Sequence, residues 1–212
     1  MTVLAVAHRA GNDLATLAAA RSARVDVVEA DVHLRRGRLE VRHAKSLGPL
    51  PRLWERWELL PDPAEPMLLE HLLRATGDQL LLLDLKGVGG VGSAVARVLG
   101  QAPRPVLVCA RWWPGLRPLA AIDGVRVVLS VRGRVELAGL HRRLRRGEAP
   151  YGVSVHRSLL SAALVGRLHE QVAFVTTWPV EDLPALAEVL ATGVSAVTSS
   201  DPQVLGALTS RR

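Results

Sequence analysis

The sequence is poor in several residue types, and each scarcity narrows the choice of function. Cys109 is the only cysteine, which excludes an internal disulfide framework and is typical of a reducing compartment. No apolar run approaches the length that a bilayer-spanning helix needs. The apolar start, residues 1–8, is short and has no basic region before it, so it lacks the pattern of a signal peptide. We therefore expect a cytoplasmic protein without a transmembrane segment.

Lysine is almost absent, although the formal net charge is +7. Lys45 and Lys86 are the only lysines, and arginine carries nearly all the remaining positive charge. Such a skew indicates a compositional bias, and no groove-reading motif accompanies it, so we expect no nucleic-acid partner. The bias makes both lysines informative, because a compact ammonium differs chemically from a planar guanidinium. Asn12, the only asparagine, is informative for the same reason.

The 212 residues alternate between apolar runs of strand length and helical segments. Runs beginning near residues 3, 25, 80, 106, 125, 153, 172 and 196 indicate eight strands. Helices are predicted over residues 14–24, 67–75, 91–99, 115–121, 134–146, 159–169, 181–191 and 202–210. Eight βα units predict a (β/α)₈ TIM barrel, with residues 1–212 as a single domain. The alternative, an open doubly wound sheet, usually has a Gly-rich phosphate turn after its first strand, where this chain has Ala10-Gly11-Asn12-Asp13.

Two features interrupt the alternation after the second strand. Residues 35–38 predict a tight turn, and residues 39–43 then return as a short strand, which makes a small β-hairpin. Residues 45–66 are rich in proline, contain Trp54 and Trp57, and are too long for a plain connector. We expect this segment to form a lid or to pack over the rim of the barrel.

The second predicted strand, residues 25–32, ends in two carboxylates. Glu29 and Asp31 are two residues apart, so they point to the same side of a strand. Unpaired carboxylates sheltered from water are costly, and a hard divalent cation such as Mg²⁺ or Ca²⁺ would neutralise them through oxygen ligation. The alternative is a strand end in solvent with both acids hydrated. Asp84 and Lys86 repeat the spacing at the end of another predicted strand.

Ionisable side chains follow several predicted strands, at the ends where (β/α)₈ barrels carry their active sites. The set combines oxygen ligands for a divalent cation, positive charges suited to phosphate oxygens, and imidazoles that can exchange protons near neutral pH. Its members are, in that order, Glu29, Asp31 and Asp84; Arg9 and Lys86; and His8 and His43. Together these groups are what the cleavage of a phosphodiester requires.

Several short motifs occur in one order along the chain. They are His8-Arg9, Val28-Glu29-Ala30-Asp31-Val32, Val41-Arg42-His43, Leu83-Asp84-Leu85-Lys86, Thr177-Trp178-Pro179-Val180, and Gly193-Val194-Ser195-Ala196-Val197 followed by Pro202. This order resembles the glycerophosphodiester phosphodiesterase family over essentially the whole chain. The resemblance implies a (β/α)₈ barrel and a metal-dependent hydrolysis that releases glycerol 3-phosphate and an alcohol. It also implies an acid–base role for both histidines, a metal role for the three acids, phosphate contacts for Arg9 and Lys86, and a place in the substrate pocket for Trp178.

The chain departs from the family pattern at several positions. Ala10 stands where the family has a glycine after His-Arg, and Asn12 stands in a shortened form of a Pro-Glu-Asn-Thr stretch. Ala44 replaces the acid that usually follows the second histidine, which leaves open what orients His43. Asp84 replaces a glutamate, and this Asp-Leu-Lys version is similar to the related sphingomyelinase D and phospholipase D branch.

Alternatives stay open for the substrate and for the product. The first hypothesis is a phosphodiesterase with a small glycerophosphodiester or lysophospholipid-like substrate. Its sphingomyelinase D-like alternative would form a cyclic phosphate, and a barrel that binds phosphate without turnover is the second hypothesis. Lys45 and His156 are further candidates for substrate contact, each weighed against a purely structural role. The remaining histidines, which are His33, His71, His141 and His169, are expected at the surface or at helix ends.

Overall fold

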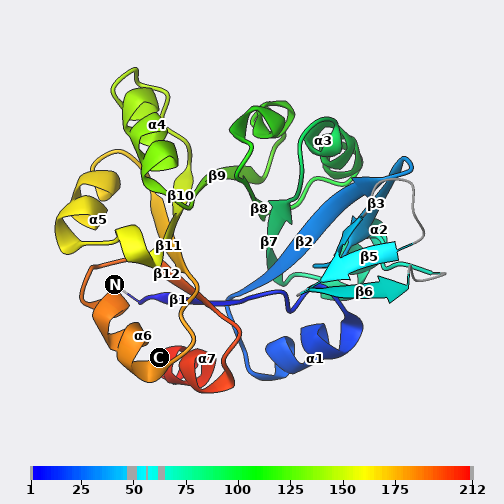
Figure 1. Cartoon of the computed structure of the whole chain (residues 1–212), viewed down its shortest axis with the longest axis horizontal. Coiled ribbons are helices and arrows are strands. Elements are labelled where there is room, and N and C mark those ends of the chain that lie inside the picture. Colours follow the sequence, from blue (N-terminus) through cyan, green and yellow to red (C-terminus); the bar gives the residue numbers. More distant parts are fainter. Residues whose placement is uncertain (1, 47–51, 56, 62–64, 211–212) are drawn as a thin grey trace.

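The computed structural model describes residues 2–46, 52–55, 57–61 and 65–210. Its barrel strands are β1 (Leu4–Ala7), β2 (Val27–Arg35), β7 (Leu80–Leu85), β8 (Val106–Ala110), β9 (Val125–Val131), β10 (Gly152–His156), β11 (Phe174–Trp178) and β12 (Ala196–Ser199). The eight strands run parallel and close into a ring, because β1 pairs with β12 on one side and with β2 on the other (Figure 1). The predicted (β/α)₈ barrel is confirmed.

Helices surround the barrel (Figure 1). Those in the described residues are α1 (Leu14–Ser22), α2 (Leu69–Thr76), α3 (Val91–Gln101), α4 (Arg134–Leu144), α5 (Ala162–His169), α6 (Leu183–Leu190) and α7 (Pro202–Thr209), with 3₁₀ helices η1 (Trp113–Leu119) and η2 (Arg157–Leu159). Capping side chains fix where several of them begin: Asp13, Ser161, Asp182 and Asp201 accept hydrogen bonds from first-turn N–H groups. Within the described chain, none of these helices has the length and apolarity to cross a membrane.

The predicted helices agree with the structure to within two residues at each end, except for two segments. The segment predicted over residues 115–121 is the 3₁₀ helix η1, because Pro114 and Pro118 lack the N–H donors that a continuous α-helix uses. The helix predicted from residue 159 begins instead at Ala162, where the Ser161 hydroxyl caps it. Hydrophobic periodicity predicts neither difference, because the first depends on prolines and the second on a capping hydroxyl.

The inside of the barrel changes from apolar to polar along the strands. One level is filled by an apolar cluster of Val6, Val27, Leu82, Leu107, Cys109, Val128, Phe174 and Ala196. Because residues two apart face the same side, the next inward positions on β9, β11 and β12 are Ser130, Thr176 and Thr198, all of them buried. The larger hydrophobic core lies between the barrel and its helices. On β1, β2 and β7 the residues two positions beyond the apolar level are instead ionisable: His8, Glu29 and Asp84.

The predicted hairpin after the second strand is present. β3 (Arg38–Val41) pairs antiparallel with β2, and Arg35 lies opposite Arg38. The two turn residues between them, Arg36 and Gly37, both have positive φ angles, of 48° and 77°. Two positive φ angles in a two-residue turn match the right-handed twist of a hairpin, and glycine adopts the second at no steric cost.

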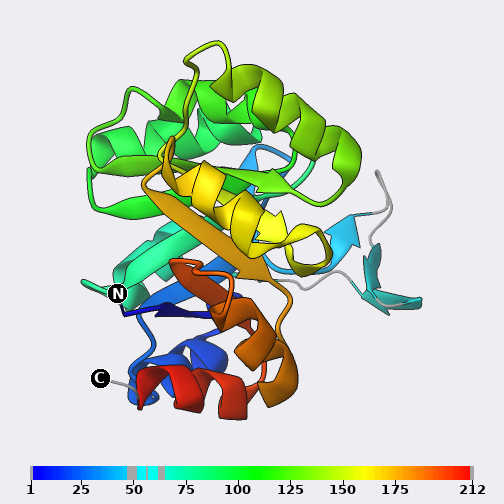
Figure 2. The ribbon, with the colours of Figure 1, turned by 90° about the vertical axis from the view of Figure 1, so that its left-hand side faces the viewer.

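The segment that follows His43 forms a small sheet of its own. Its strands are β4 (Lys45–Ser46), β5 (Arg52–Glu55) and β6 (Glu58–Pro61), all antiparallel. Figure 2 shows this sheet projecting from one end of the barrel. The sequence analysis expected a lid or a rim-packing segment here and did not predict strands; residues 47–51, 56 and 62–64 of the segment lie outside the described residues.

A glycine in α3 offers a test of how closely the outer helices pack. A Cβ atom added to Gly92 would lie 1.7 Å from the carbonyl oxygen of Gly115 in η1. We expect Gly92→Ala to lower the free energy of unfolding by roughly 1–3 kcal/mol, because the two elements must move apart. Urea unfolding followed by circular dichroism measures the change.

Gly100→Ala is the matched control in the same helix. An added Cβ there meets nothing within 4 Å. Alanine is the better helix former, so this variant should be as stable as the parent or more stable by up to about 1 kcal/mol. Equal destabilisation by both substitutions would contradict the close approach of α3 and η1.

Candidate active site

Three carboxylates meet at the end of the barrel where the strands terminate. Glu29 and Asp31 face inward from β2, and the register of the sheet places Asp84 of β7 directly beside Asp31. One carboxylate oxygen from each of the three lies within 4.8 Å of the others. Glu29 and Asp31 are almost fully buried, with exposed fractions of 4% and 0%. The predicted convergence of these acids is therefore confirmed in geometry.

Lys86 supplies the positive charge inside this acid cluster. Its Nζ lies 2.6 Å from Asp31 Oδ1 and also contacts Asp84 Oδ2. Burial alone would lower the pKa of Lys86, but the three carboxylates, led by Asp84, raise it above its usual value. The ammonium is therefore charged at every pH at which the protein would work.

The same electrostatic environment does not shift the pKa values of the three acids in one direction. Burial raises the pKa of Glu29 well above its usual value, and the charges of Asp31 and Asp84 raise it further. Burial acts in the same direction on Asp31, but Lys86 and the Asn12 amide outweigh it, so the pKa of Asp31 is lowered. Asp84 keeps a raised pKa because burial exceeds the effect of Lys86.

The loop after β1 holds the acids in place through its backbone and Asn12. The Asn12 amide donates to Asp31 Oδ2 and accepts from the Asp31 N–H, both at 2.8 Å. The Arg9 N–H donates to Glu29 Oε2 at 2.5 Å, and Arg9 adopts a positive φ of 58°. Gly11 lies so close to β2 that an added Cβ would be 2.8 Å from Ala30 Cβ. Asn12, the only asparagine, thus has a structural role, because its two hydrogen bonds hold Asp31 in place.

Arg9 and His8 also lie beside the acids. Arg9 Nε is 3.8 Å from Asp31 Oδ2. His8 is largely sheltered from water, and this burial, with the charge of Arg9 next in effect, lowers the pKa of its imidazole to about 4. His8 is therefore neutral at physiological pH and able to accept a proton.

His43 meets an acid that the sequence analysis did not identify. Its Nδ1 lies 2.7 Å from Glu55 Oε1, and Glu55 belongs to β5 of the small sheet. Twelve residues separate the two along the chain. Only the pairing of β4 with β5 brings them together, and no periodicity in the proline-rich segment predicts that pairing.

The remaining predicted residues have varied positions. His156 and Trp178 lie side by side on β10 and β11, with ring centroids 5.1 Å apart in an edge-to-face arrangement. In the ring of strands, β10 stands opposite β2, so this pair is across the barrel from the acids. Lys45 is exposed on β4, opposite Trp54, and no ion pair joins it to the described acid cluster.

His33 differs from its expected surface position. It follows Asp31 by two residues on β2, so it faces the same side, and it is only partly exposed. Burial, with the charge of Arg42 next in effect, lowers its pKa to about 4. The period-two spacing from Glu29 through Asp31 was the signal that could have placed His33 at the site.

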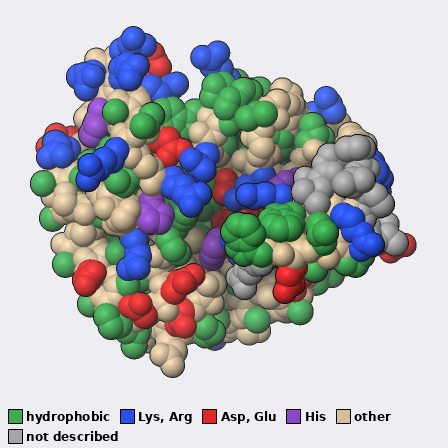
Figure 3. Space-filling view, viewed as in Figure 1, with side chains coloured by type: hydrophobic (Ala, Val, Ile, Leu, Met, Phe, Trp, Pro, Cys, Tyr) green, Lys and Arg blue, Asp and Glu red, His purple; other side chains and the backbone are tan. Residues whose placement is uncertain are grey.

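On the face of the molecule shown in Figure 3, acidic side chains lie in a central hollow with basic and histidine side chains around them. The donor set fits a hard divalent cation: the three carboxylates offer only oxygen ligands, and a single ammonium is in contact with them among the described residues. Glu29 makes no described ion pair and would gain most from such an ion. Glu29, Asp31 and Asp84 are therefore the residues that could hold it.

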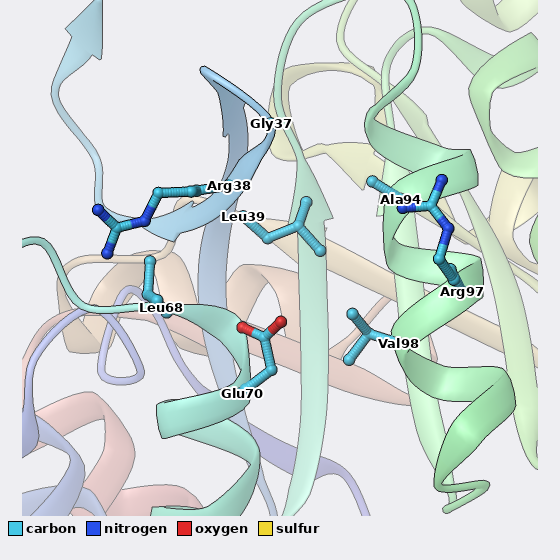
Figure 4. A pocket seen from close by; sticks show the side chains of 8 residues that line it. All are labelled: Gly37, Arg38, Leu39, Leu68, Glu70, Ala94, Arg97 and Val98. Carbon is cyan, nitrogen blue, oxygen red and sulfur yellow. The ribbon is translucent and has the colours of Figure 1, made fainter.

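A second hollow lies outside the barrel and away from this cluster. It is a small cavity of about 160 Å³, and Figure 4 shows the side chains around it. Gly37, Arg38, Leu39, Leu68, Glu70, Ala94, Arg97 and Val98 line it, from the β2–β3 hairpin, α2 and α3. None of the acids, imidazoles or cations described above contributes to it, so it is separate from the candidate active site.

Comparisons with known proteins were made at three levels. No family model matches the sequence, and no curated protein matches it. Solved structures do match over the whole chain. A glycerophosphodiester phosphodiesterase from Thermotoga maritima superimposes with a TM-score of 0.77 at 14% identity, covering 100% of this chain and 99% of its own.

Two further solved structures agree with this. A phosphodiesterase from Oleispira antarctica in complex with the product sn-glycerol-3-phosphate gives a TM-score of 0.74 at 19% identity, covering 99% of this chain and 97% of its own. A glycerophosphodiester phosphodiesterase from Agrobacterium tumefaciens gives 0.69 at 15% identity, covering 99% of this chain and 100% of its own. The chain therefore has the fold of glycerophosphodiester phosphodiesterases of known structure.

The fit of a divalent cation can be tested by thermal unfolding. We expect millimolar Mg²⁺ or Ca²⁺ to raise the melting temperature of the parent, because an ion that binds only the folded state stabilises it by mass action. Glu29→Gln should abolish that rise. It should also leave the metal-free protein as stable as the parent or more stable, because it removes a buried charge that Asp31 and Asp84 repel. Glu170→Gln, at an exposed position on the outer surface, should retain the full response. A cation response that survives Glu29→Gln would remove Glu29 from the ligand set.

The depressed pKa of His8 has a consequence for stability. The folded pKa of about 4 lies below the ordinary value of 6.5, so between these values the unfolded chain binds more protons. Stability should thus fall as pH falls from 6.5 toward 4, by roughly 2 kcal/mol from this group alone. His8→Gln should flatten that dependence in urea unfolding measured from pH 4.5 to 7.5, whereas His141→Gln should not. Parallel curves for the parent and His8→Gln would show that His8 is not buried in its neutral form.

Proposed function

We propose that the protein is a glycerophosphodiester phosphodiesterase, a metal-dependent enzyme that hydrolyses a small glycerophosphodiester to glycerol 3-phosphate and an alcohol. The observation that carries the proposal is the meeting of Glu29, Asp31, Asp84 and Lys86 at one barrel mouth, with His8 electrostatically coupled both to Asp31 and to His43. The fold shared with solved phosphodiesterases, one of them holding sn-glycerol-3-phosphate, supports the same reaction class.

The substrate phosphate would be bound by fixed positive charge. Lys86 is already held among the acids, and the Arg9 guanidinium, about a third exposed, lies next to Asp31 and can turn toward a phosphate oxygen. A divalent cation held by the three carboxylates would polarise the phosphoryl oxygens and offset their negative charge. Either Mg²⁺ or Ca²⁺ suits an all-oxygen donor set.

The two imidazoles would move the protons. His8 is neutral and can take a proton from the attacking water as its oxygen bonds to phosphorus. His43 can give a proton to the alcohol oxygen as the phosphorus–oxygen bond to it breaks. The net reaction adds one water to the diester, and passage of the proton from His8 to His43 through solvent returns both imidazoles to their starting states. Trp178 and His156 lie across the barrel from the acids and would contact the part of the substrate that leaves.

Substitution of either histidine tests the acid–base assignment. We expect His8→Ala and His43→Ala each to reduce turnover of glycerophosphocholine by roughly 10²- to 10⁴-fold, because general acid–base catalysis contributes about that much. Release of choline and of glycerol 3-phosphate is measured with Mg²⁺ or Ca²⁺ and again with a chelator, which should stop it.

His141→Ala, on the outer helix α4, is the control and should turn over at the parent rate. Undiminished turnover in both active-site variants would remove the two histidines from the mechanism. A parent protein that releases no glycerol 3-phosphate from any member of a panel of glycerophosphodiesters would refute the proposed function. Accumulation of a cyclic phosphate as the end product would assign the chain to the sphingomyelinase D-like reaction instead.

A further inference from the structure

The two imidazoles of the candidate site have different partners. His43 Nδ1 is 2.7 Å from the Glu55 carboxylate, and both side chains are sheltered to a similar degree, with exposed fractions of 28% and 29%. His8 has no carboxylate hydrogen bond among the described contacts; burial instead keeps it neutral. His43 therefore has a carboxylate that can orient its ring, and His8 has none among the described contacts.

The register of the small sheet explains how Glu55 reaches His43. Lys45 pairs with Trp54 and Ser46 pairs with Leu53, so the next residue back along β4, Ala44, falls opposite Glu55. The acid missing at position 44 is thus supplied from the returning strand, next to the same histidine. The absence of an acid at Ala44 and the presence of one at Glu55 therefore compensate for each other across the two strands.

The part of the small sheet next to the barrel is held by packing and hydrogen bonds, which supports the contact between His43 and Glu55. Ala44 and Leu53 are both buried, and the Arg42 guanidinium donates to the carbonyl oxygen of Ala44. Arg42 is itself fixed by a buried ion pair, with Nε 2.9 Å from Glu40 Oε2. The residues on either side of His43, Arg42 and Ala44, are therefore held in place by buried contacts.

A carboxylate on Nδ1 determines what the other ring nitrogen can do. It holds the proton on Nδ1, fixes the plane of the ring and leaves Nε2 as the nitrogen that faces the reacting atoms. It also stabilises the imidazolium, which is the form that donates a proton to a leaving oxygen. Asp31, His8 and His33 also interact electrostatically with His43, but the hydrogen bond described for its ring joins Nδ1 to the Glu55 carboxylate.

We propose that Glu55 is the positioning residue of His43, and that the small sheet β4–β5–β6 delivers it to make His43 the proton donor of the reaction. This inference rests on the proposed function for the reaction that it serves. Glu55 touches neither substrate nor cation in this role; it acts through the imidazole. The small sheet thereby becomes part of the catalytic machinery.

Steady-state kinetics on glycerophosphocholine provide the first test. We expect Glu55→Gln to lower kcat by roughly 10- to 100-fold with KM changed by less than about twofold, because orientation of the acid is lost and substrate contacts are kept. Glu58→Gln is the matched control, since Glu58 faces Glu55 across the β5–β6 ladder and is exposed; it should leave both constants unchanged. Glu55→Asp, which keeps the charge, should recover part of the lost rate. Equal effects of Glu55→Gln and Glu58→Gln would overturn the proposal.

A substrate whose leaving group needs no proton separates positioning of a proton donor from a merely structural role. A p-nitrophenyl phosphodiester has such a leaving oxygen, so the defect of Glu55→Gln should shrink to less than about threefold on it. An equal defect of Glu55→Gln on both substrates would overturn the proposal.

Nuclear magnetic resonance of the resting protein tests the contact without turnover. In the parent, the neutral His43 ring should carry its proton on Nδ1, and the share of this tautomer should fall in Glu55→Gln but not in Glu58→Gln. An identical His43 tautomer in all three proteins would overturn the proposal even if the enzyme is active. If the parent hydrolyses no glycerophosphodiester but His43 still responds to Glu55→Gln, the proposed function fails and the positioning contact stands.

Discussion

The structure depends on how one ammonium group is shared among buried acids. Asp31 is completely buried between β1 and β7, and Lys86 lies 2.6 Å from it while also contacting Asp84. Without that positive charge, the carboxylates would repel one another in a place where water cannot screen them. Asn12 donates to Asp31 Oδ2, and the backbone of the first loop donates to Glu29 Oε2. The cluster thus gathers three carboxylates around one ammonium, an all-oxygen donor set that suits a divalent cation.

The barrel makes this concentration of charge possible. One level of its interior is filled by apolar side chains, and the inward positions beyond that level carry buried hydroxyl groups on some strands and ionisable groups on others. Because all eight strands run in the same direction, their ends meet at one mouth, and residues far apart in sequence become neighbours there. The adjacent register of Asp31 and Asp84 follows directly from the pairing of β2 with β7.

The mouth also gives its two imidazoles different surroundings. His8 sits in a sheltered position next to positive charge, which favours the neutral ring. His43 sits at the junction between the barrel and the small sheet, where its Nδ1 meets the Glu55 carboxylate. Two copies of one residue type can thus take different roles, because the partners of each ring differ.

Sequence and tertiary structure determined different parts of this picture. The sequence alone was enough for the eight βα units, the β2–β3 hairpin and the inward convergence of Glu29, Asp31 and Asp84, because strand periodicity and strand direction fix which side chains share a side and an end. Two proline residues make η1 a 3₁₀ helix, which hydrophobic periodicity did not predict. His33 was expected at the surface because the period-two spacing of Glu29 and Asp31 was not extended to the next residue on that side. The contact of Glu55 with His43 was decided only by tertiary structure: it depends on the register of two short strands in a segment without clear periodicity, and register is set by pairing partners that are distant in the chain.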